Sequence, residues 1–204
     1  MNLPNALTLA RIFLVPLLVV VLLTKFEGPV ILGVKKELLG AAIFGLASLT
    51  DWLDGYLARR RKQVTALGQL MDPLADKLLI TAALVSLVQM DRAPAWMVAV
   101  VLGREFAVTV LRSLAHSRGV PIAASPLGKF KMVSQVVAIL LLILATEDSP
   151  QFLTLGRAAL WVAVFTAVGS AVDYYRRFNY VLTGREAAAS PVNRDEIADV
   201  HRIN

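Results

Sequence analysis

The chain has 204 residues, the size of a single domain. It is 57% hydrophobic, above the about 45–50% that is usual for soluble domains, and its 21 basic and 15 acidic residues give a net charge of +6. We attribute the positive charge to contact with anionic lipid headgroups, and expect no binding to nucleic acid. The absence of cysteine excludes disulfides and cysteine-ligated metals.

Six apolar segments are long enough to form helices that cross about 30 Å of hydrocarbon. They lie at residues 5–24, 38–59, 70–90, 94–116, 128–146 and 154–176. The first has no basic n-region before it and no small-residue cleavage pattern after it, so we expect a retained span. The sequence therefore predicts an all-α integral membrane protein with six transmembrane helices at 1–180 and an exposed polar tail at 181–204.

Basic residues between the predicted spans indicate the orientation of the chain. Arg59, Arg60, Arg61 and Lys62 separate the second and third segments, and Arg176 with Arg177 follows the sixth. The opposite side is less basic despite Lys35 and Lys36. Because cytoplasmic loops carry the excess of lysine and arginine, both termini and the connection after the second segment are predicted on the cytoplasmic side.

Four aspartates flank that connection and provide the strongest indication of function. Asp51 and Asp54 are three residues apart near the end of the second segment, and Asp72 and Asp76 are four apart near the start of the third. Each pair therefore shares one helix face, and two helices joined by a short connection must lie side by side. Charged side chains inside an apolar span are functional-site candidates by default. Pro73 predicts that the third helix begins or kinks nearby.

Four carboxylates without histidine or cysteine form a hard-oxygen site, which suits Mg²⁺ or Mn²⁺. One or two such ions would neutralise negative charges that cannot stand together in a low-dielectric setting. Divalent ions in a carboxylate cluster typically serve phosphate chemistry. Gly55 and Ala58 lie on the same face as Asp51 and leave room for a bulky group near the backbone.

The spacing of eight residues resembles the signature of the CDP-alcohol phosphatidyltransferases, D-x2-D-G-x2-A-R-x8-G-x3-D-x3-D. The matching residues are Asp51, Asp54, Gly55, Ala58, Arg59, Gly68, Asp72 and Asp76. Within that family, "LPNALTLAR" (3–11), "GREFAVTVLR" (103–112) and "SPLGKFKMVSQ" (125–135) make residues 3–178 look like the bacterial phosphatidylglycerophosphate synthase branch. Met132 stands where that branch commonly has threonine.

The resemblance implies a six-helix fold of the bacterial cytoplasmic membrane, commonly a homodimer, around a cytosol-facing polar cavity. It implies that the phosphatidyl group of CDP-diacylglycerol is transferred to an alcohol with release of CMP. By the family pattern, Asp51, Asp54, Asp72 and Asp76 hold two divalent ions, and Asp76 is also the general base. The cytidine and diphosphate groups are expected against Asp54, Gly55, Ala58, Arg59 and Gly68. We predict direct transfer, without a covalent enzyme intermediate.

Basic residues in the fourth and fifth segments indicate a phosphorylated acceptor, glycerol 3-phosphate in this branch. The candidates are Arg104, Arg112, Lys129 and Lys131. A phosphate dianion requires such cations, although arginines near helix ends also extend to lipid headgroups. For Arg60, Arg61 and Lys62 we favour an orientation signal with lipid contact, and for Asp173 a structural ion pair.

Asn5, Thr8 and Arg11 are helix neighbours at spacings of three residues. They either bind the donor phosphate, which the resemblance favours, or anchor the first helix at the interface. Three other functions stay open: the same reaction with serine, inositol phosphate or a choline-type acceptor, a membrane prenyltransferase, and a divalent-cation transporter. The prenyltransferase would need more widely separated aspartate motifs, and the transporter would need broken helices and repeat symmetry.

Overall fold

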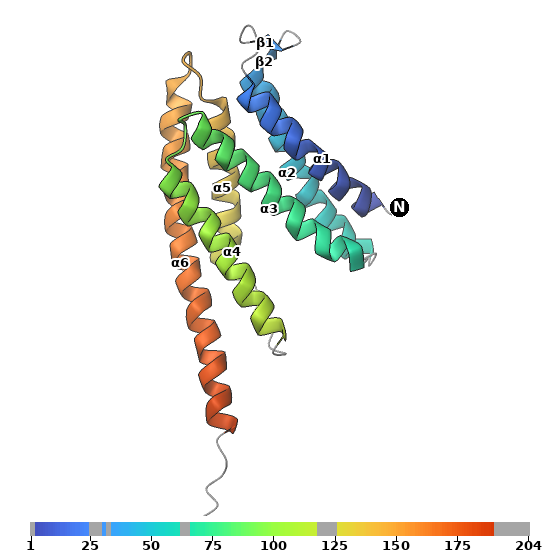
Figure 1. Cartoon of the computed structure of the whole chain (residues 1–204), viewed down its shortest axis with the longest axis vertical. Helices are drawn as coiled ribbons and strands as arrows, with labels where there is room; N and C mark the ends of the chain where they lie inside the picture. The colour runs from blue at the N-terminus through green and yellow to red at the C-terminus, as the bar shows by residue number, and fades with distance from the viewer. Residues whose placement is uncertain (1–2, 25–29, 32–33, 62–65, 118–125, 190–204) are drawn as a thin grey trace, which may run out of the picture.

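The computed structural model describes the backbone at residues 3–24, 30–31, 34–61, 66–117 and 126–189, and most side chains within 8–24, 34–50, 74–117 and 130–179. Over these residues the chain forms six helices (Figure 1). They are α1 (Leu3–Leu23), α2 (Lys36–Arg61), α3 (Ala66–Gln89), α4 (Ala95–Ser117), α5 (Pro126–Leu144) and α6 (Pro150–Ala189). The all-helical fold class is therefore confirmed, and eleven of the twelve helix ends lie within four residues of the prediction.

Two helices differ in detail from the prediction. Helix α6 has 40 residues and continues to Ala189, into the segment predicted as a polar tail. Helix α3 begins at Ala66, so Pro73 lies about two turns inside it and does not mark its start. A proline at this depth removes one backbone hydrogen bond without ending the helix.

A short antiparallel pair of strands that the sequence did not predict precedes α2. In it β1 (Val30–Ile31) pairs with β2 (Val34–Lys35), with Val30 opposite Lys35 and Ile31 opposite Val34. Strands of two residues are too short to produce a recognisable alternation of apolar and polar residues.

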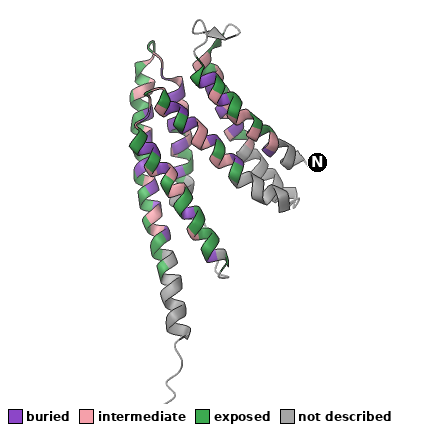
Figure 2. Cartoon of the chain, in the orientation of Figure 1, coloured by how far each residue is buried: buried purple, intermediate pink, exposed green. Residues whose placement is uncertain are grey.

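The helices pack as two groups of three that share one core. Helix α1 lies against α2 and α3, while α6 lies against α4 and α5, and contacts of α2 with α5 and of α3 with α4 and α5 join the groups (Figure 1). Every helix contributes a fully buried side chain to the core, as the stripes of buried residues in Figure 2 indicate. One from each helix, in chain order, is Leu18, Phe44, Leu84, Val101, Leu142 and Leu160.

Two glycines allow helices to approach closely. A Cβ atom added at Gly156 of α6 would lie 2.8 Å from the side chain of Leu142 on α5 and 3.0 Å from its backbone nitrogen. One added at Gly40 of α2 would lie 2.6 Å from Leu22 Cδ2 on α1. Both are closer than carbon atoms approach without a clash, so Gly40 and Gly156 serve packing within the chain.

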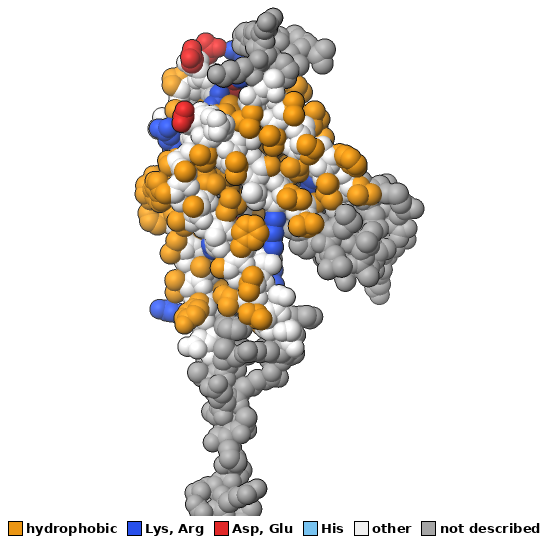
Figure 3. Space-filling model, in the orientation of Figure 1, with side chains coloured by type: hydrophobic (Ala, Val, Ile, Leu, Met, Phe, Trp, Pro, Cys, Tyr) orange, Lys and Arg blue, Asp and Glu red, His pale blue; other side chains and the backbone are white. Residues whose placement is uncertain are grey.

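Large apolar side chains are exposed on all six helices. In chain order, one per helix, Phe13, Leu46, Val85, Phe106, Val133 and Phe165 are between 52% and 74% exposed. Figure 3 shows hydrophobic side chains spread over the visible face, with acidic side chains gathered at one end. Soluble monomers rarely expose apolar surface on this scale, so the helices suit an apolar environment.

Within the described residues, one helix is by itself long and apolar enough to cross a membrane, the part of α6 from Pro150 to Arg176. Thr8–Leu23 in α1 and Phe130–Leu144 in α5 are shorter apolar stretches.

Arg92, in the connection between α3 and α4, contacts both α2 and α5 at the end of the bundle that carries β1 and β2. Its Nη1 donates hydrogen bonds to the carbonyl oxygens of Ile143 (2.8 Å) and Leu142 (3.3 Å) in the last turn of α5. Its Nη2 lies 3.4 Å from Glu37 Oε1 in the first turn of α2. Both side chains of this ion pair are mostly buried, so Arg92 satisfies helix-end carbonyls that have no partner within α5.

Candidate active site

The helix bounds place the four aspartate positions at matching depths. Asp51 lies ten residues before the end of α2 and Asp76 ten residues after the start of α3. Asp54 and Asp72 lie seven and six residues from the same ends. At a rise of about 1.5 Å per residue, Asp51 and Asp76 lie about 15 Å from those ends, and Asp54 and Asp72 lie about 10 Å from them. Because α2 and α3 run antiparallel and contact each other, Asp51 lies level with Asp76, and Asp54 with Asp72.

Several of the predicted site residues lie outside the side chains that the structure describes, so their predicted contacts stay predictions. They are Asn5, Asp51, Asp54, Gly55, Ala58, Arg59, Gly68, Asp72 and Lys129. Asp76, Thr8, Arg11, Arg104, Arg112 and Lys131 are described.

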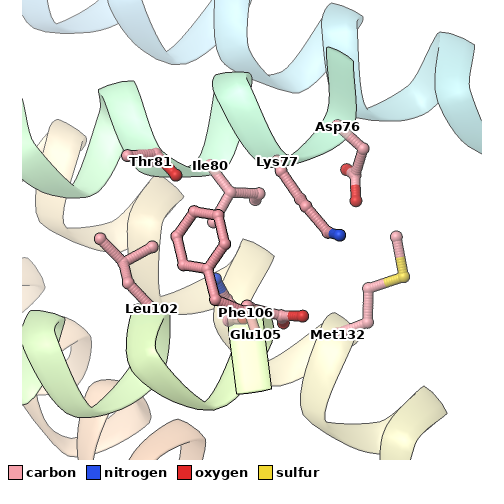
Figure 4. A pocket seen from close by; sticks show the side chains of 9 residues that line it. Asp76, Lys77, Ile80, Thr81, Leu102, Glu105, Phe106 and Met132 are labelled. Atoms are coloured by element: carbon pink, nitrogen blue, oxygen red, sulfur yellow. The ribbon is translucent and has the colours of Figure 1, made fainter. Parts of the chain in front are cut away.

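Asp76 lines a pocket between α3, α4 and α5. Helix α3 contributes Asp76, Lys77, Ile80 and Thr81. The pocket is completed by Leu102, Glu105 and Phe106 of α4 and by Met132 and Gln135 of α5. In Figure 4 the side chains of Asp76 and Lys77 point from α3 into the space that Glu105, Phe106 and Met132 border on the other side. The last aspartate of the motif therefore faces a cavity that contains other charged groups.

Lys77 is a pocket residue that the sequence interpretation missed. Its Nζ donates a hydrogen bond to Thr109 Oγ1 over 2.7 Å, and that hydroxyl donates to the carbonyl oxygen of Glu105, also over 2.7 Å. This chain of hydrogen bonds from α3 to α4 holds the ammonium group in the pocket, one residue after Asp76. The available signal was a lysine directly after the last motif aspartate in an otherwise apolar run.

Arg104, Glu105 and Lys131 form a buried ionic group. The Lys131 ammonium pairs with Glu105 Oε1, and Arg104 Nη1 lies 3.5 Å from Glu105 Oε2. Arg104 Nε also donates to Ser170 Oγ of α6 over 3.1 Å. The side chains of Arg104 and Lys131 are 9% and 3% exposed. They therefore face the interior of the bundle, which excludes the lipid-headgroup interpretation for these two.

Arg112 joins the same region through Tyr174 of α6. Its Nη2 donates to the phenolic oxygen over 2.8 Å. The guanidinium carbons of Arg112 and Arg104 lie 5.5 Å and 5.8 Å from the centre of the Tyr174 ring, within the range of cation–π attraction. Three of the four cations predicted to bind the acceptor phosphate are thus described, and the structure brings these three together.

We call Asp76, Lys77, Arg104, Glu105, Arg112 and Lys131 the charged cluster. Its four cations and two carboxylates carry a net charge of +2. Lys131 is buried, Arg112 is exposed and the other four are partly buried. An excess of positive charge in such a partly buried setting favours an anionic ligand. A phosphate dianion would neutralise it.

Thr8 and Arg11 of α1 are 2% and 1% exposed. An arginine that anchors a helix among lipid headgroups would be exposed, so the burial of Arg11 favours an inward role. The helix that carries it packs directly on α3, the helix that carries Asp72 and Asp76.

An apolar groove of about 770 Å³ lies between α2 and α5. Gly45, Ser48 and Leu49 line it from α2, two to six residues before Asp51, and α5 lines it between Met132 and Leu140. Met132 also lines the pocket that contains Asp76. The apolar groove and the pocket that contains Asp76 therefore share one lining side chain.

Comparisons with known proteins agree on one family. The model of the family CDP-alcohol phosphatidyltransferase matches residues 1–169. A CDP-diacylglycerol–glycerol-3-phosphate 3-phosphatidyltransferase of Bacillus subtilis (strain 168) is 46% identical over 184 residues, covering 86% of this chain and 94% of that protein. A protein of the same name from Rickettsia typhi is 36% identical over 177 residues, covering 86% and 96%. A CMP-forming cardiolipin synthase of Oryza sativa subsp. japonica is 32% identical over 200 residues, covering 89% of this chain and 59% of that protein.

Proposed function

Because the chain belongs to the CDP-alcohol phosphatidyltransferase family, we propose that it transfers the phosphatidyl group of CDP-diacylglycerol to glycerol 3-phosphate. The products are CMP and phosphatidylglycerol phosphate. The family match supports the type of reaction, and the names of the Bacillus and Rickettsia relatives support both substrates.

The observation that carries this proposal is that Met132 lines both the apolar groove and the pocket that contains Asp76. A CDP-linked lipid has apolar chains and a charged head, so it requires an apolar channel that opens beside a charged pocket. The groove between α2 and α5 suits an acyl chain, because Val133, Val136 and Leu140 line it. The pocket beside it contains Asp76 and Lys77.

The charged cluster supports a phosphorylated acceptor. Arg104, Arg112 and Lys131 come from two helices and lie around Glu105 and Tyr174. A guanidinium group held in a fixed orientation binds phosphate oxygens with good geometry. Serine as acceptor would bring its own ammonium group into an excess of positive charge, which disfavours it. Lys129 precedes Lys131 by two residues and stays a predicted member of this site.

The donor set of Asp51, Asp54, Asp72 and Asp76 suits two Mg²⁺ or Mn²⁺ ions. Level positions on two antiparallel, contacting helices support this fit, as does the all-oxygen chemistry of the side chains. Bound there, the ions would supply charge neutralisation for the diphosphate and for the departing CMP. Gly55, Ala58, Arg59 and Gly68 are proposed to border the nucleotide, and Asn5, Thr8 and Arg11 the donor phosphate.

Residues of this chain would carry the remaining steps. The Asp76 carboxylate accepts the proton of the reacting acceptor hydroxyl. The hydroxyl oxygen then forms a bond to the lipid-side phosphorus while the bond from that phosphorus to the CMP oxygen breaks. Lys77, fixed by Thr109, balances negative charge in the pocket. No bond between phosphorus and the enzyme forms at any stage, so transfer is direct.

We also propose that all six helices span the membrane, with the charged cluster open to the cytoplasm. The exposed apolar side chains on each helix support this arrangement. The basic residues in the last turn of α2, and Arg176 with Arg177 within α6, support the orientation. The domain limits at 1–180 and the homodimer stay predictions.

CMP release by the purified protein tests the function. CDP-diacylglycerol and Mg²⁺ are supplied with glycerol 3-phosphate, serine or inositol phosphate. Release is expected with glycerol 3-phosphate and not with serine or inositol phosphate. It should fall at least about 100-fold in Asp76→Asn, within the range for loss of a general base. Asp148→Asn, the same change at an exposed residue at the opposite end of the bundle, should leave release unchanged.

Other outcomes are equally informative. Release with serine would keep the reaction type and overturn the interpretation of the basic residues, and release with inositol phosphate would keep both and change the acceptor. A phosphatidylated aspartate trapped without acceptor would overturn direct transfer. No release with any acceptor, together with metal flux into liposomes, would replace the transferase by a transporter.

A further inference from the structure

Gln135 of α5 lines the pocket that contains Asp76 and is 3% exposed. Its Nε2 is buried and has no hydrogen-bond acceptor among the residues that the structure describes. More than about 90% of buried polar groups in proteins have a partner. A buried amide donor that borders a cavity and has no acceptor among the described residues indicates a partner that enters the cavity.

The position of Gln135 relates it to the charged cluster. Gln135 follows Lys131 by one helical turn, so the two side chains lie on the same face of α5. Lys131 pairs with Glu105, which lines the same pocket as Asp76. The lining of the pocket thus includes the carboxylates of Asp76 and Glu105, the ammonium group of Lys77 and the neutral amide of Gln135.

The proposed acceptor has three polar groups for these three kinds of side chain. Its phosphate requires the cations, and its reacting hydroxyl requires Asp76. The middle hydroxyl of the three-carbon chain is left, and a neutral hydroxyl suits an amide, which can donate to it and accept from it. Ile80, Leu102 and Phe106 border the same pocket and offer no hydrogen bond.

We infer that Gln135 donates a hydrogen bond to the middle hydroxyl of glycerol 3-phosphate and so selects for acceptors that carry it. This inference rests on the proposed function and deepens it. Gln135 is assigned as a specificity residue that contacts the substrate away from the reacting atoms.

The test compares two acceptors and two forms of the enzyme. 3-Hydroxypropyl phosphate keeps the phosphate and the reacting hydroxyl and lacks the middle hydroxyl. Gln135→Met keeps the length of the side chain and removes the amide. The measured quantity is kcat/KM for CMP release with saturating CDP-diacylglycerol. Gln151→Met makes the same change at an exposed position in the first turn of α6.

The wild-type protein should lose about 10- to 100-fold in kcat/KM with 3-hydroxypropyl phosphate, since a site built around a hydroxyl discriminates strongly against its absence. The kcat/KM of Gln135→Met with glycerol 3-phosphate should be lower than the wild-type value by a similar factor. The kcat/KM values of this variant for the two acceptors should differ by less than about threefold. Gln151→Met should keep the wild-type ratio.

Equal losses of Gln135→Met with both acceptors would overturn the inference and leave the transferase intact. So would a wild-type protein that uses both acceptors equally well. Absence of CMP release from the wild-type protein with glycerol 3-phosphate would instead overturn the proposed function, and the inference with it.

Thermal unfolding without substrate gives an independent readout. Gln135→Met should unfold at or above the wild-type temperature, because an apolar side chain replaces a buried amide whose Nε2 has no partner among the described residues. A clearly lower unfolding temperature would indicate a partner within the chain and overturn the inference.

Discussion

Arg112 of α4 donates a hydrogen bond from Nη2 to the phenolic oxygen of Tyr174 on α6, over 2.8 Å. Tyr174 is 2% exposed, so packing fixes its ring. The hydrogen bond and the ring face together limit the orientations of the guanidinium group. A cation that is already ordered loses less entropy when it binds phosphate. Tyr174 is therefore a positioning residue for Arg112.

Tyr174→Phe keeps the ring and removes the hydroxyl. The KM for glycerol 3-phosphate should rise by about 5- to 10-fold, part of the effect of a hydrogen bond to a charged group, while kcat changes by less than about twofold. Tyr175→Phe, at a side chain that is 61% exposed, should keep the wild-type values. Steady-state CMP release measures both constants. An unchanged KM with a reduced kcat would show that Tyr174 does not act through acceptor binding.

Glu105 balances two buried cations, Lys131 and Arg104. Glu105→Gln should lower the free energy of unfolding by about 2–4 kcal/mol, because it leaves buried positive charge without its carboxylate. Inorganic phosphate should recover more stability in this variant than in the wild-type protein, since a ligand stabilises the state that binds it. Thermal unfolding with and without phosphate measures both effects.

The exposed Glu147 supplies the matched control. Glu147→Gln should change neither the unfolding temperature nor the response to phosphate. If phosphate stabilised Glu105→Gln no more than the wild-type protein, the charged cluster would not be an anion site.

The sequence predicts the helices well because long apolar runs have few alternatives. It also predicts the described cations of the cluster, since Arg104, Arg112 and Lys131 stand out in apolar segments. The prediction of the end of α6 was wrong for the same reason: helix was inferred from long apolar runs, and after Arg176 apolar and polar residues are mixed.

The partners of these cations were not predictable from local pattern. Arg112 and Tyr174 are 62 residues apart, and Lys77 and Thr109 are 32 apart. Such pairs form only when α3, α4 and α6 pack, and a tyrosine or threonine in an apolar helix gives no sign of its partner. Gln135 likewise becomes notable only once its burial and the adjacent pocket are known.

Arg92 should be important for stability and not for catalysis. Arg92→Met removes hydrogen bonds to the last turn of α5 and the ion pair with Glu37. We expect a loss of about 2–4 kcal/mol in the free energy of unfolding, since both partners are mostly buried. CMP release per folded molecule should stay at the wild-type level. The exposed Arg157, which makes one long hydrogen bond of 3.4 Å to Asp91, provides the control, and Arg157→Met should lose much less. An equal loss of unfolding free energy in the two variants would contradict the structural role assigned to Arg92.

Gly156 sets the separation of α5 and α6. Gly156→Ala should destabilise the protein by about 1–3 kcal/mol, because the new methyl group would overlap Leu142 and the backbone there cannot yield. Gly169 lies on the same helix with no atom within 4 Å of an added Cβ. Gly169→Ala should be neutral or stabilising by up to about 1 kcal/mol, from helix propensity. Thermal unfolding of the two variants distinguishes a packing effect at Gly156 from a general intolerance of alanine in α6. A general intolerance would lower the unfolding temperature of both variants.

Lys35 of β2 and Asp148, in the turn between α5 and α6, form an exposed ion pair with an N–O distance of 2.6 Å. The hydrogen bond from Lys35, and then its charge, holds the pKa of the Asp148 carboxyl below its ordinary value. Because the folded-state pKa is the lower one, the pair stabilises the protein above the ordinary aspartate pKa of about 3.9, and this contribution is lost as the pH falls through the folded-state value. An NMR titration of Asp148 should therefore give a depressed pKa in the wild-type protein and an ordinary one in Lys35→Met. Lys36→Met removes a neighbouring lysine and should leave the titration depressed. An ordinary pKa in the wild-type protein would show that the pair does not persist in solution.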